Sequence, residues 1–375
     1  MDQLMSENKQ WIDEAWEKID AKLKKVAARN KHIIAGKTEN GRYLDYSKPE
    51  KIGEWINGFW PGMMWLMYDA TGDAAYREVA EHSEEALDLA QEKFDRLHHD
   101  VGFMWLLSSV ANHTITGNPK SRIRALHAAA ILGARYNANG QFIGAWSWGI
   151  KNCNYVIIDC MMNISLLFWA SRQTNNPSYK TIAMHHADTG IRDHVRDDGS
   201  VNHCLEYDPD TGEVIGKPFT QGYDMESSWT RGQAWAIYGY TNAYRNTGEK
   251  RYLDTAKRVA HYFVANICHT DYVPKADFMQ PDDQLDTSAG AIAACGLIEM
   301  AKAVPARESR MYMEAALKIM KSLTEKHCDW SHEVDPILMN CSGYWNKVIH
   351  EPAMYGEYYY VEAMYKLKGF DKNFW

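Results

Sequence analysis

Residues 232–264 read GQAWAIYGYTNAYRNTGEKRYLDTAKRVAHYFV, and two helical segments meet in this stretch at the turn Thr247-Gly248. The first segment is apolar on most of its faces, as expected of a helix that is buried on all sides. The second segment carries charges along one side only, which is typical of a helix with one face toward solvent. The stretch therefore predicts a hairpin of one inner and one outer helix.

The same two-segment pattern occurs four more times, at residues 58–87, 102–132, 159–191 and 289–323. A large side chain stands at the same place in each of the five second segments: Tyr76, Ile123, Tyr179, Tyr252 and Tyr312. A sixth apolar segment follows at 356–369, and an amphipathic segment at 7–30 can serve as its partner. Repetition of one hairpin along the chain indicates a repeat architecture.

Six consecutive hairpins predict an all-α fold, an (α/α)6 barrel or six-hairpin toroid in which six outer helices surround six inner ones. A linear solenoid is the alternative, but a first segment that can pair with the last favours a closed ring. We expect residues 1–375 to form a single catalytic domain, with the N-terminal helix packed beside the C-terminal helix. The inner helices of such a ring run parallel, so the loops before them meet at one mouth. We expect the substrate there.

The composition is that of a globular protein with an ample core, at 46% hydrophobic and 24% charged residues. The net charge of −8 argues against nucleic acid or an anionic membrane as a partner. No apolar run is long enough to span a bilayer, and the first residues lack a signal-peptide pattern, so we expect a cytoplasmic protein. Seven cysteines without a C-x-x-C pair indicate reduced thiols. The sequence leaves homo-oligomerisation open.

The common cofactor motifs do not occur in the sequence. It contains no G-x-G-x-x-G, Walker A or G-x-S-x-G element, which argues against dinucleotide, phosphate-loop and α/β-hydrolase chemistry. His98-His99 and His185-His186 lack the spacing of zinc ligands, and we expect them to be surface or hydrogen-bonding histidines. We therefore expect neither a metal nor a cofactor.

Aromatic residues are unusually frequent, with 14 Trp and 22 Tyr. Several tryptophans stand near glycines in sequence typical of loops: Trp55, Trp60, Trp146, Trp148, Trp229 and Trp345. Most of the tryptophans are expected to be core or loop anchors. Aromatic faces beside polar loops are also how proteins bind sugars, so the composition favours a carbohydrate site.

Asp159 begins the third inner segment, inside the apolar stretch YVIIDCMMNISLLFW at residues 155–169. Burial there would raise its pKa, as a general acid requires. Alternatively, Asp159 is an N-cap whose carboxylate accepts backbone N–H bonds, which would lower its pKa. Asp100 holds the equivalent place before the second inner segment, and for it the N-cap is the simpler interpretation. Two acids at one mouth can also form the acid/base pair of glycoside chemistry.

Arg231 lies just before the fourth inner segment, in the stretch SSWTRGQAW at residues 227–235. An arginine at this place can bind a carboxylate through two parallel hydrogen bonds, or it can cap the carbonyls of a loop. Because Trp229 and Trp235 flank it, a pocket for a sugar acid is the more economical interpretation.

Five motifs along the chain resemble those of the unsaturated glucuronyl hydrolases of glycoside hydrolase family 88. They are GFWPGMMWL (58–66), HHDVGF (98–103), IIDCMMNISLLFWA (157–170), WTRGQAW (229–235) and GEYYYVEA (356–363). The similarity extends over residues 40–365, and the (α/α)6 barrel of the family agrees with the repeat. The resemblance implies release of the 4,5-unsaturated uronic acid from the non-reducing end of glycosaminoglycan oligosaccharides made by polysaccharide lyases. In this family the vinyl-ether double bond is hydrated, with a proton delivered to C4 and water added at C5.

Matched by motif, the resemblance implies that Asp159 is the general acid/base. It implies that Asp100 orients the sugar or stabilises the developing charge. The implied substrate-binding residues are polar or aromatic side chains of the mouth: Trp55, His99, Trp146, His203, Gln221, Arg231 and Trp235. The expected partners are unsaturated uronyl disaccharides and short oligosaccharides.

One region departs from the pattern of the family. Relatives that prefer sulfated fragments carry Ser-x-x-Ser-x-Lys before the last inner segment, whereas this chain has Ser342-Gly-Tyr-Trp345-Asn-Lys347. Ser342 and Lys347 are expected to contact a sulfate. Trp345 can instead stack on the second sugar and shift the preference toward unsulfated or differently sulfated substrates.

Two other functions compete with this interpretation. An unsaturated rhamnogalacturonyl hydrolase acting on pectin fragments has the same barrel, but the contexts of WTRGQAW and IIDC match the glucuronyl enzymes better. A non-catalytic toroid that binds sugars at its aromatic mouth is the second alternative, and it would bind without turnover.

Overall fold

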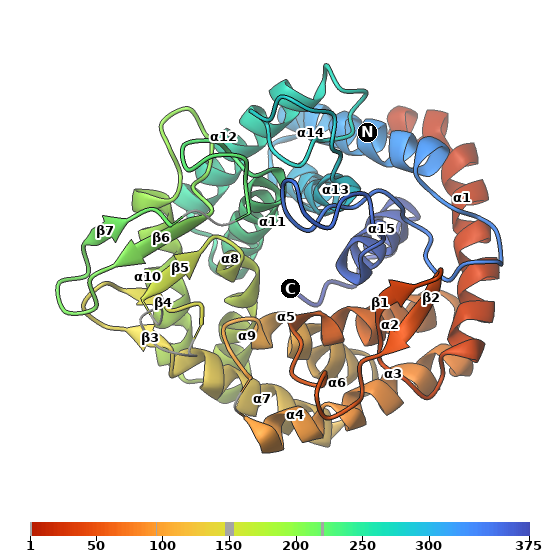
Figure 1. Ribbon diagram of the computed structural model, residues 1–375, viewed down its shortest axis with the longest axis horizontal. Helices are drawn as coiled ribbons and strands as arrows, with labels where there is room; N and C mark the ends of the chain where they lie inside the picture. Colours follow the sequence, from red (N-terminus) through yellow and green to blue (C-terminus); the bar gives the residue numbers. More distant parts are fainter. Residues whose placement is uncertain (1, 95, 147–153, 219–220) are drawn as a thin grey trace.

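Helices arranged in two concentric rings make up most of the molecule (Figure 1). The computed structural model describes residues 2–94, 96–146, 154–218 and 221–375, so Trp148 and Cys153 lie outside the described residues. The inner ring consists of α2 (Phe59–Thr71), α5 (Val101–Trp105), the π-helix η2 (Leu106–Val110), α6 (Ala111–Thr116), α8 (Cys160–Asn163), α9 (Ser165–Thr174), α11 (Thr230–Thr247), α13 (Thr287–Ala303) and α15 (Met354–Leu367).

The outer ring consists of α1 (Asp2–Arg29), α3 (Ala74–Ala86), α4 (Asp88–Lys93), α7 (Pro119–Gly133), α10 (Pro177–Asp193), α12 (Lys250–Ile267) and α14 (Ala306–Lys326). Contacts between inner helices run from α2 through η2, α5, α8, α11 and α13 to α15, and α15 contacts α2 again. This circle of contacts excludes a linear solenoid and confirms the predicted (α/α)6 barrel.

Turn chemistry explains where the hairpins reverse. Gly72 and Gly248 end α2 and α11 in the left-handed conformation, with φ of 71° and 74°, which a residue with a side chain adopts at a cost. The outer helices then begin at side-chain caps: the Asn118 and Asn176 side chains accept hydrogen bonds from backbone N–H groups two residues later. Each cap is followed by a proline at the first helical position, where no N–H is needed.

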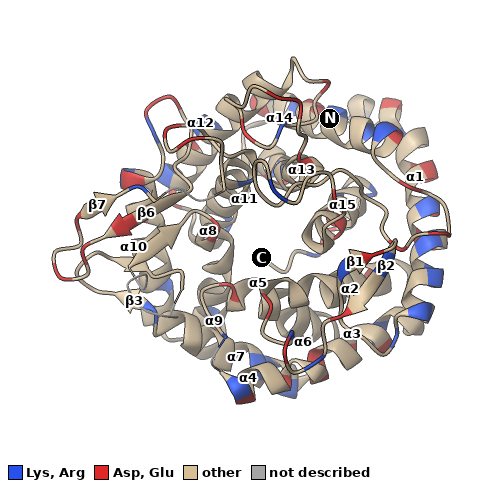
Figure 2. Ribbon diagram, viewed as in Figure 1, with Lys and Arg blue, Asp and Glu red and all other residues tan. Residues whose placement is uncertain are grey.

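The charged side chains lie mainly on the outer helices and on the loops, and fewer lie on the inner helices, among them Glu357, Glu362 and Lys366 of α15 (Figure 2). This distribution follows from burial, because α11, α13 and α15 are enclosed on nearly every face. No helix in the described part of the chain has the length and apolar character needed to cross a bilayer. The six described cysteines are all free thiols.

The first helix packs against the last one. Trp16 of α1 lies with its ring 6.4 Å from that of Tyr365 of α15 and 5.8 Å from that of Phe370. Lys368 pairs with Asp13 at 2.5 Å. The N-terminal helix α1 thus packs beside α15, the last inner helix.

Three small sheets lie in the loops that precede inner helices, and the helical periodicity did not predict them. A hairpin joins β1 (Ala35–Glu39) to β2 (Arg42–Asp45), and a shorter one joins β3 (Tyr136–Asn137) to β4 (Phe142–Ile143). In the third sheet β6 (Cys204–Tyr207) pairs with both β5 (Tyr155–Ile157) and β7 (Val214–Gly216). The third sheet matters most, since β5 leads into α8 and so carries Asp159.

Aromatic rings fill the middle of the barrel. The ring of Trp375 stacks on that of Tyr359 at 5.8 Å and 14°, and it meets the edge of Phe103 at 5.9 Å. Its indole N–H donates to Glu362 Oε1 at 3.1 Å. Phe103 in turn lies 5.1 Å from the ring of Trp235. Inner helices α5, α11 and α15 therefore meet through rings at the centre.

Glu357 is buried at the start of α15 and accepts hydrogen bonds from the backbone N–H groups of Ile337 and Leu338. Burial raises its pKa to about 7. Because this exceeds the usual 4.5, the associated stabilisation is complete below pH 4.5 and is lost as the pH rises through 7.

We expect Glu357→Gln, which does not ionise, to be more stable than the wild type at pH 8 by on the order of 3 kcal/mol. At pH 4 the two proteins are expected to have nearly the same free energy of unfolding. Urea unfolding at both pH values measures the difference. A difference that stays constant with pH would contradict this explanation.

Candidate active site

The loops that precede the inner helices bring aromatic rings together at the mouth. Trp55, on the short 3-10 helix η1 (Trp55–Gly58), stacks on Tyr355 with ring centres 5.2 Å apart and a 25° angle. The same ring lies 5.6 Å from Phe103. Trp55 is half-buried, so one part of the indole remains open to the mouth.

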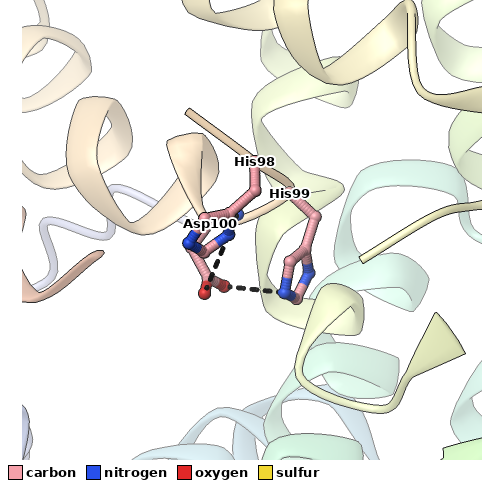
Figure 3. A group of neighbouring side chains, drawn as sticks. All are labelled: His98, His99 and Asp100. Carbon is pink, nitrogen blue, oxygen red and sulfur yellow. Dashed lines mark hydrogen bonds and ion pairs between the residues drawn. The ribbon is translucent and has the colours of Figure 1, made fainter. Parts of the chain in front are cut away.

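Asp100 occupies the N-cap position of α5, but its side chain makes no cap hydrogen bond. Instead, Asp100 Oδ1 accepts a hydrogen bond from Asn163 Nδ2 at 2.9 Å. His98 Nδ1 lies 3.5 Å from Oδ2, and His99 Nε2 lies 3.4 Å from Oδ1 (Figure 3). The N-cap interpretation of Asp100 is therefore wrong, because the carboxyl group faces polar side chains rather than its own helix.

Burial raises the pKa of Asp100 well above its usual value, and the nearby charge of Asp159 adds to the increase. The hydrogen bond from Asn163 and the charge of Arg135 oppose it. Burial also lowers the pKa of His98 to about 3. Asp100 is thus a carboxyl group held toward its protonated form, beside a neutral imidazole.

Asp159 lies in the turn between β5 and α8. It holds the N-cap position of α8 without a cap hydrogen bond, so the N-cap alternative is wrong here too. Its Oδ2 is 3.2 Å from His203 Nε2. The sheet explains this proximity, because the N–H of Ile158 donates to the carbonyl of His203 at 3.0 Å.

The enclosed apolar setting expected for Asp159 is found more fully at Asp100. The Asp159 side chain is 14% exposed, and that of Asp100 is 11% exposed among packed neighbours. Asp100 is thus slightly less exposed than Asp159. The two acids come from neighbouring inner helices, as the repeat predicts.

His98, His99 and Asp100 form a group whose ligand atoms all lie within 4.8 Å of one another, which is close enough to hold a metal ion. The sequence favoured hydrogen-bonding histidines at this place. The positive charge of Arg135 acts on both imidazoles, where it lowers their pKa values, and such a charge opposes a cation. The donors of this group are better suited to orienting an acid.

Arg231 is buried and donates to Asp286 Oδ2 (2.5 Å) and to the carbonyl oxygens of Ser342 (2.5 Å) and Gly343 (2.6 Å). Its guanidinium also lies over the ring of Trp229, 4.4 Å from the centre. These contacts are those of an arginine that caps loop carbonyls. The sequence analysis had favoured the other interpretation, a pocket for a sugar acid. Arg231 thus holds the 342–343 segment at the mouth.

Two further expected contacts lie too deep for a sugar. Trp235 is fully buried against Phe103 and Tyr359, so it supports the floor and forms no wall. His99 is also fully buried, and its Nε2 lies 3.4 Å from Asp100 Oδ1. The sequence could not separate these core positions from wall positions, because both face the barrel axis.

Trp146 and Gln221 remain at the mouth. Trp146 is half-buried, with its ring 6.3 Å from that of Tyr155. The backbone carbonyl of Gln221 accepts from the N–H of Trp345 at 2.9 Å. Among the described residues, no group hydrogen-bonds to Gln221 Oε1, although this atom is buried. Both side chains keep surface available for a ligand.

The segment from Ser342 to Lys347 differs from the expected sulfate site. Ser342 is 1% exposed, and its hydroxyl donates to the carbonyl of Leu285 at 2.6 Å, so it does not face a ligand. Lys347 is exposed. Trp345 donates from its indole to Asp282 Oδ2 at 3.2 Å and meets the ring of Tyr223 edge-on at 4.8 Å. Of the expected pair, only Lys347 is placed to meet an anion.

Sequence reasoning missed Asn163, which hydrogen-bonds to Asp100 from another helix. A signal was present, because Asn163 follows Asp159 by four residues and is polar within an apolar helix. Sequence reasoning also gave no role to Arg135, whose charge acts on Asp100. Nothing in the sequence around Arg135 identifies it as a residue of the site.

Comparisons with known proteins agree with this geometry. The sequence profile of Glycosyl Hydrolase Family 88 matches residues 26–371. The chain is 36% identical over 321 residues to an unsaturated chondroitin disaccharide hydrolase of Streptococcus pyogenes serotype M1, covering 83% of this chain and 80% of that protein.

Two solved structures are similar over nearly their full length. The unsaturated glucuronyl hydrolase of Bacillus sp. GL1, described as responsible for the degradation of glycosaminoglycan, superposes with a TM-score of 0.88 at 33% identity, covering 94% of this chain and 97% of that one. A variant of the Streptococcus agalactiae enzyme, solved in complex with dGlcA-GalNAc6S, gives a TM-score of 0.81 at 30% identity, covering 97% and 93%.

Proposed function

Since the chain belongs to glycoside hydrolase family 88, we propose that it releases the 4,5-unsaturated uronic acid from glycosaminoglycan oligosaccharides by hydrating the vinyl-ether double bond. Membership of this family makes the chain an enzyme, which removes the non-catalytic sugar-binding toroid from consideration. The observation that carries the proposal is the placement of Asp100 and Asp159 at one aromatic mouth, on neighbouring inner helices.

In the proposed reaction the Asp159 carboxyl group donates its proton to C4 of the unsaturated sugar. The π electrons of the C4–C5 double bond form the new C–H bond, and the positive charge left at C5 is shared with the ring oxygen. A water molecule then adds to C5 and returns a proton to the Asp159 carboxylate. The resulting hemiketal at C5 opens to a ketone at C5 and a hemiacetal at C1. The hemiacetal then collapses to an aldehyde: its C1–O bond to the second sugar breaks, and the second sugar leaves as an alcohol that takes up the hydroxyl proton.

The charge of Asp159 helps to keep a proton on the Asp100 carboxyl group, because a second negative charge close by raises the cost of ionising it. The short distance of 3.2 Å between Asp159 Oδ2 and His203 Nε2 places a polar partner beside the proposed acid. Asp100 in this scheme orients the sugar in the site.

The loss of ultraviolet absorbance from the double bond tests the proposed function. We expect turnover of unsaturated disaccharides from chondroitin, hyaluronan or heparin, and much weaker turnover of those from pectin. Equal or faster turnover of the pectin fragments would favour a rhamnogalacturonyl hydrolase. Failure to consume any unsaturated uronide would contradict the proposal.

Lys347 is the proposed contact for a sulfate group on the second sugar. It is exposed at the tip of the 344–347 turn, where an ion pair contributes at most ~1 kcal/mol. We therefore expect Lys347→Ala to raise KM about fivefold for a sulfated disaccharide and to leave the unsulfated one unchanged. Lys250→Ala on the outer helix α12 is the matched control, and an equal rise for both substrates would argue against a sulfate contact.

We also propose that the enzyme works in the cytoplasm, on disaccharides imported after lyase action. The six described cysteines are free thiols, which suits a reducing compartment. Fractionation of the source cells with an antibody against the protein would test this location.

A further inference from the structure

Asn163 is the polar side chain that joins the two acidic loops. It lies in α8, one turn after Asp159, and none of its surface is exposed. The neighbours of Asn163 in the helix are apolar, so an amide at this position carries a desolvation cost unless its hydrogen bonds are satisfied.

The hydrogen bonds of Asn163 fix the orientation of its amide. Oδ1 accepts from the backbone N–H of Phe103 at 2.7 Å, and a backbone N–H can only donate. Nδ2 therefore points the other way, where it donates to Asp100 Oδ1 at 2.9 Å and, more weakly, to the carbonyl of Asp159 at 3.4 Å. One side chain thus connects the helix of Asp100 to the loop of Asp159.

Gly102 makes this contact sterically feasible. A Cβ atom at position 102 would lie 2.4 Å from Asn163 Oδ1 and 2.5 Å from its Cα, which no real structure tolerates. The absence of a side chain lets α5 and α8 approach until the Asn163 amide reaches Asp100. The contact therefore depends on residues from both helices.

We propose that Asn163 is a positioning residue for the reaction, which holds the Asp100 carboxyl group in one rotamer through a hydrogen bond to Oδ1. The inference rests on the proposed function of the two acids. Because the carbonyl oxygen of a carboxyl group is the better acceptor, the hydrogen bond to Oδ1 favours Oδ2 as the site of a proton on Asp100. The protonated carboxyl group of Asp100 then has Oδ2 as its hydrogen-bond donor and Oδ1 as its acceptor.

Other charged or titratable groups also face Asp100. They come from its own loop and from the packed elements around it: His98, His99, Arg135, Asp159, Cys160 and Tyr359. Asn163 Nδ2 donates to Oδ1 at 2.9 Å, whereas His99 Nε2 stays at 3.4 Å from the same oxygen. Loss of the amide should therefore change the behaviour of Asp100 itself.

The test compares Asn163→Ala with the wild type in kcat, in KM and in the pH dependence of kcat. We expect kcat to fall about 10- to 100-fold, as loss of a hydrogen bond to a charged group predicts, with KM nearly unchanged. The donated hydrogen bond favours the ionised carboxylate, so the pH profile should move to higher pH. Asn163→Asp, which keeps the shape but replaces the donor by an acceptor, should move it further.

Another variant controls for structural damage. Asn112 is also buried and donates to a carboxylate, Glu84 Oε2 at 2.5 Å, on a different inner helix. Asn112→Ala should lower the melting temperature and leave the pH profile where it is.

Carbon-13 NMR titration of the Asp100 carboxyl group, identified by its absence in Asp100→Asn, gives a readout without turnover. We expect a higher pKa for Asp100 in Asn163→Ala than in the wild type. An unchanged pKa in a folded variant would overturn the inference even if the wild type proved to hydrolyse no unsaturated uronide. Unchanged kcat and pH profile in an active enzyme would overturn it equally.

Discussion

Asp159→Asn is expected to lower kcat by about 10²- to 10⁴-fold, the contribution that a positioned general acid typically makes. Asparagine keeps the size of the side chain but cannot deliver the proton to C4 or take one from water. KM should change little, because the variant still fills the same space near His203. Consumption of the unsaturated disaccharide, followed by absorbance, measures the loss.

The control for this variant is Asp73→Asn, which changes an aspartate that does cap a helix, by accepting from the N–H of Ala75. It should leave kcat unchanged and cost only helix stability, about 1 kcal/mol or less. Asp159→Asn should melt close to the wild type, since Asp159 makes no cap bond. A folded Asp159→Asn protein with full activity would rule out Asp159 as the acid.

Asp100→Asn is expected to lower activity by about 10²-fold or more, since it removes the second carboxyl group of the pair. The same variant should become more stable than the wild type as the pH rises, because the wild type loses stability. The folded pKa of Asp100 is raised, so its stabilisation is complete below the unfolded pKa and is lost as the pH rises through the folded one. Each unit of the increase costs about 1.4 kcal/mol at high pH, and asparagine avoids this cost.

Melting temperatures of Asp100→Asn and the wild type, compared at pH 4 and pH 8, test the second effect. The variant should be nearly equal to the wild type at low pH and more stable at high pH. Its amide can still accept the hydrogen bond from Asn163 Nδ2. A variant that loses both activity and stability at pH 8 would show that Asp100 serves mainly to hold the fold.

Periodicity and turn chemistry made the barrel predictable. Five hairpins and two terminal segments are local patterns, and caps such as Asn118 and Asn176 with the following prolines mark where helices begin. The short strands were not predictable, because β5 (Tyr155–Ile157) pairs with β6, residues 204–207, although α8, α9 and α10 lie between them in the chain. Pairing over such a separation leaves no local signal.

The site was predictable in its residues and less so in its geometry. The motifs point to Asp100 and Asp159, but whether an aspartate caps its helix depends on a side-chain rotamer that the sequence does not determine. The same limit applies to Arg231. Binding a ligand carboxylate and capping loop carbonyls differ only in which oxygen atoms accept the hydrogen bonds of its guanidinium group, and the sequence does not determine these acceptors. The contact between Asn163 and Asp100 crosses two helices and requires the missing side chain at Gly102.

The filled centre of the barrel limits which part of a polymer can react. Trp375, Tyr359, Phe103 and Trp235 pack ring against ring below the mouth and fill the centre of the barrel. A sugar chain cannot thread through such a filled centre and must enter and leave by the same side. The enzyme is therefore built to act in an exo fashion, on one terminal residue at a time, and not to move along a polysaccharide.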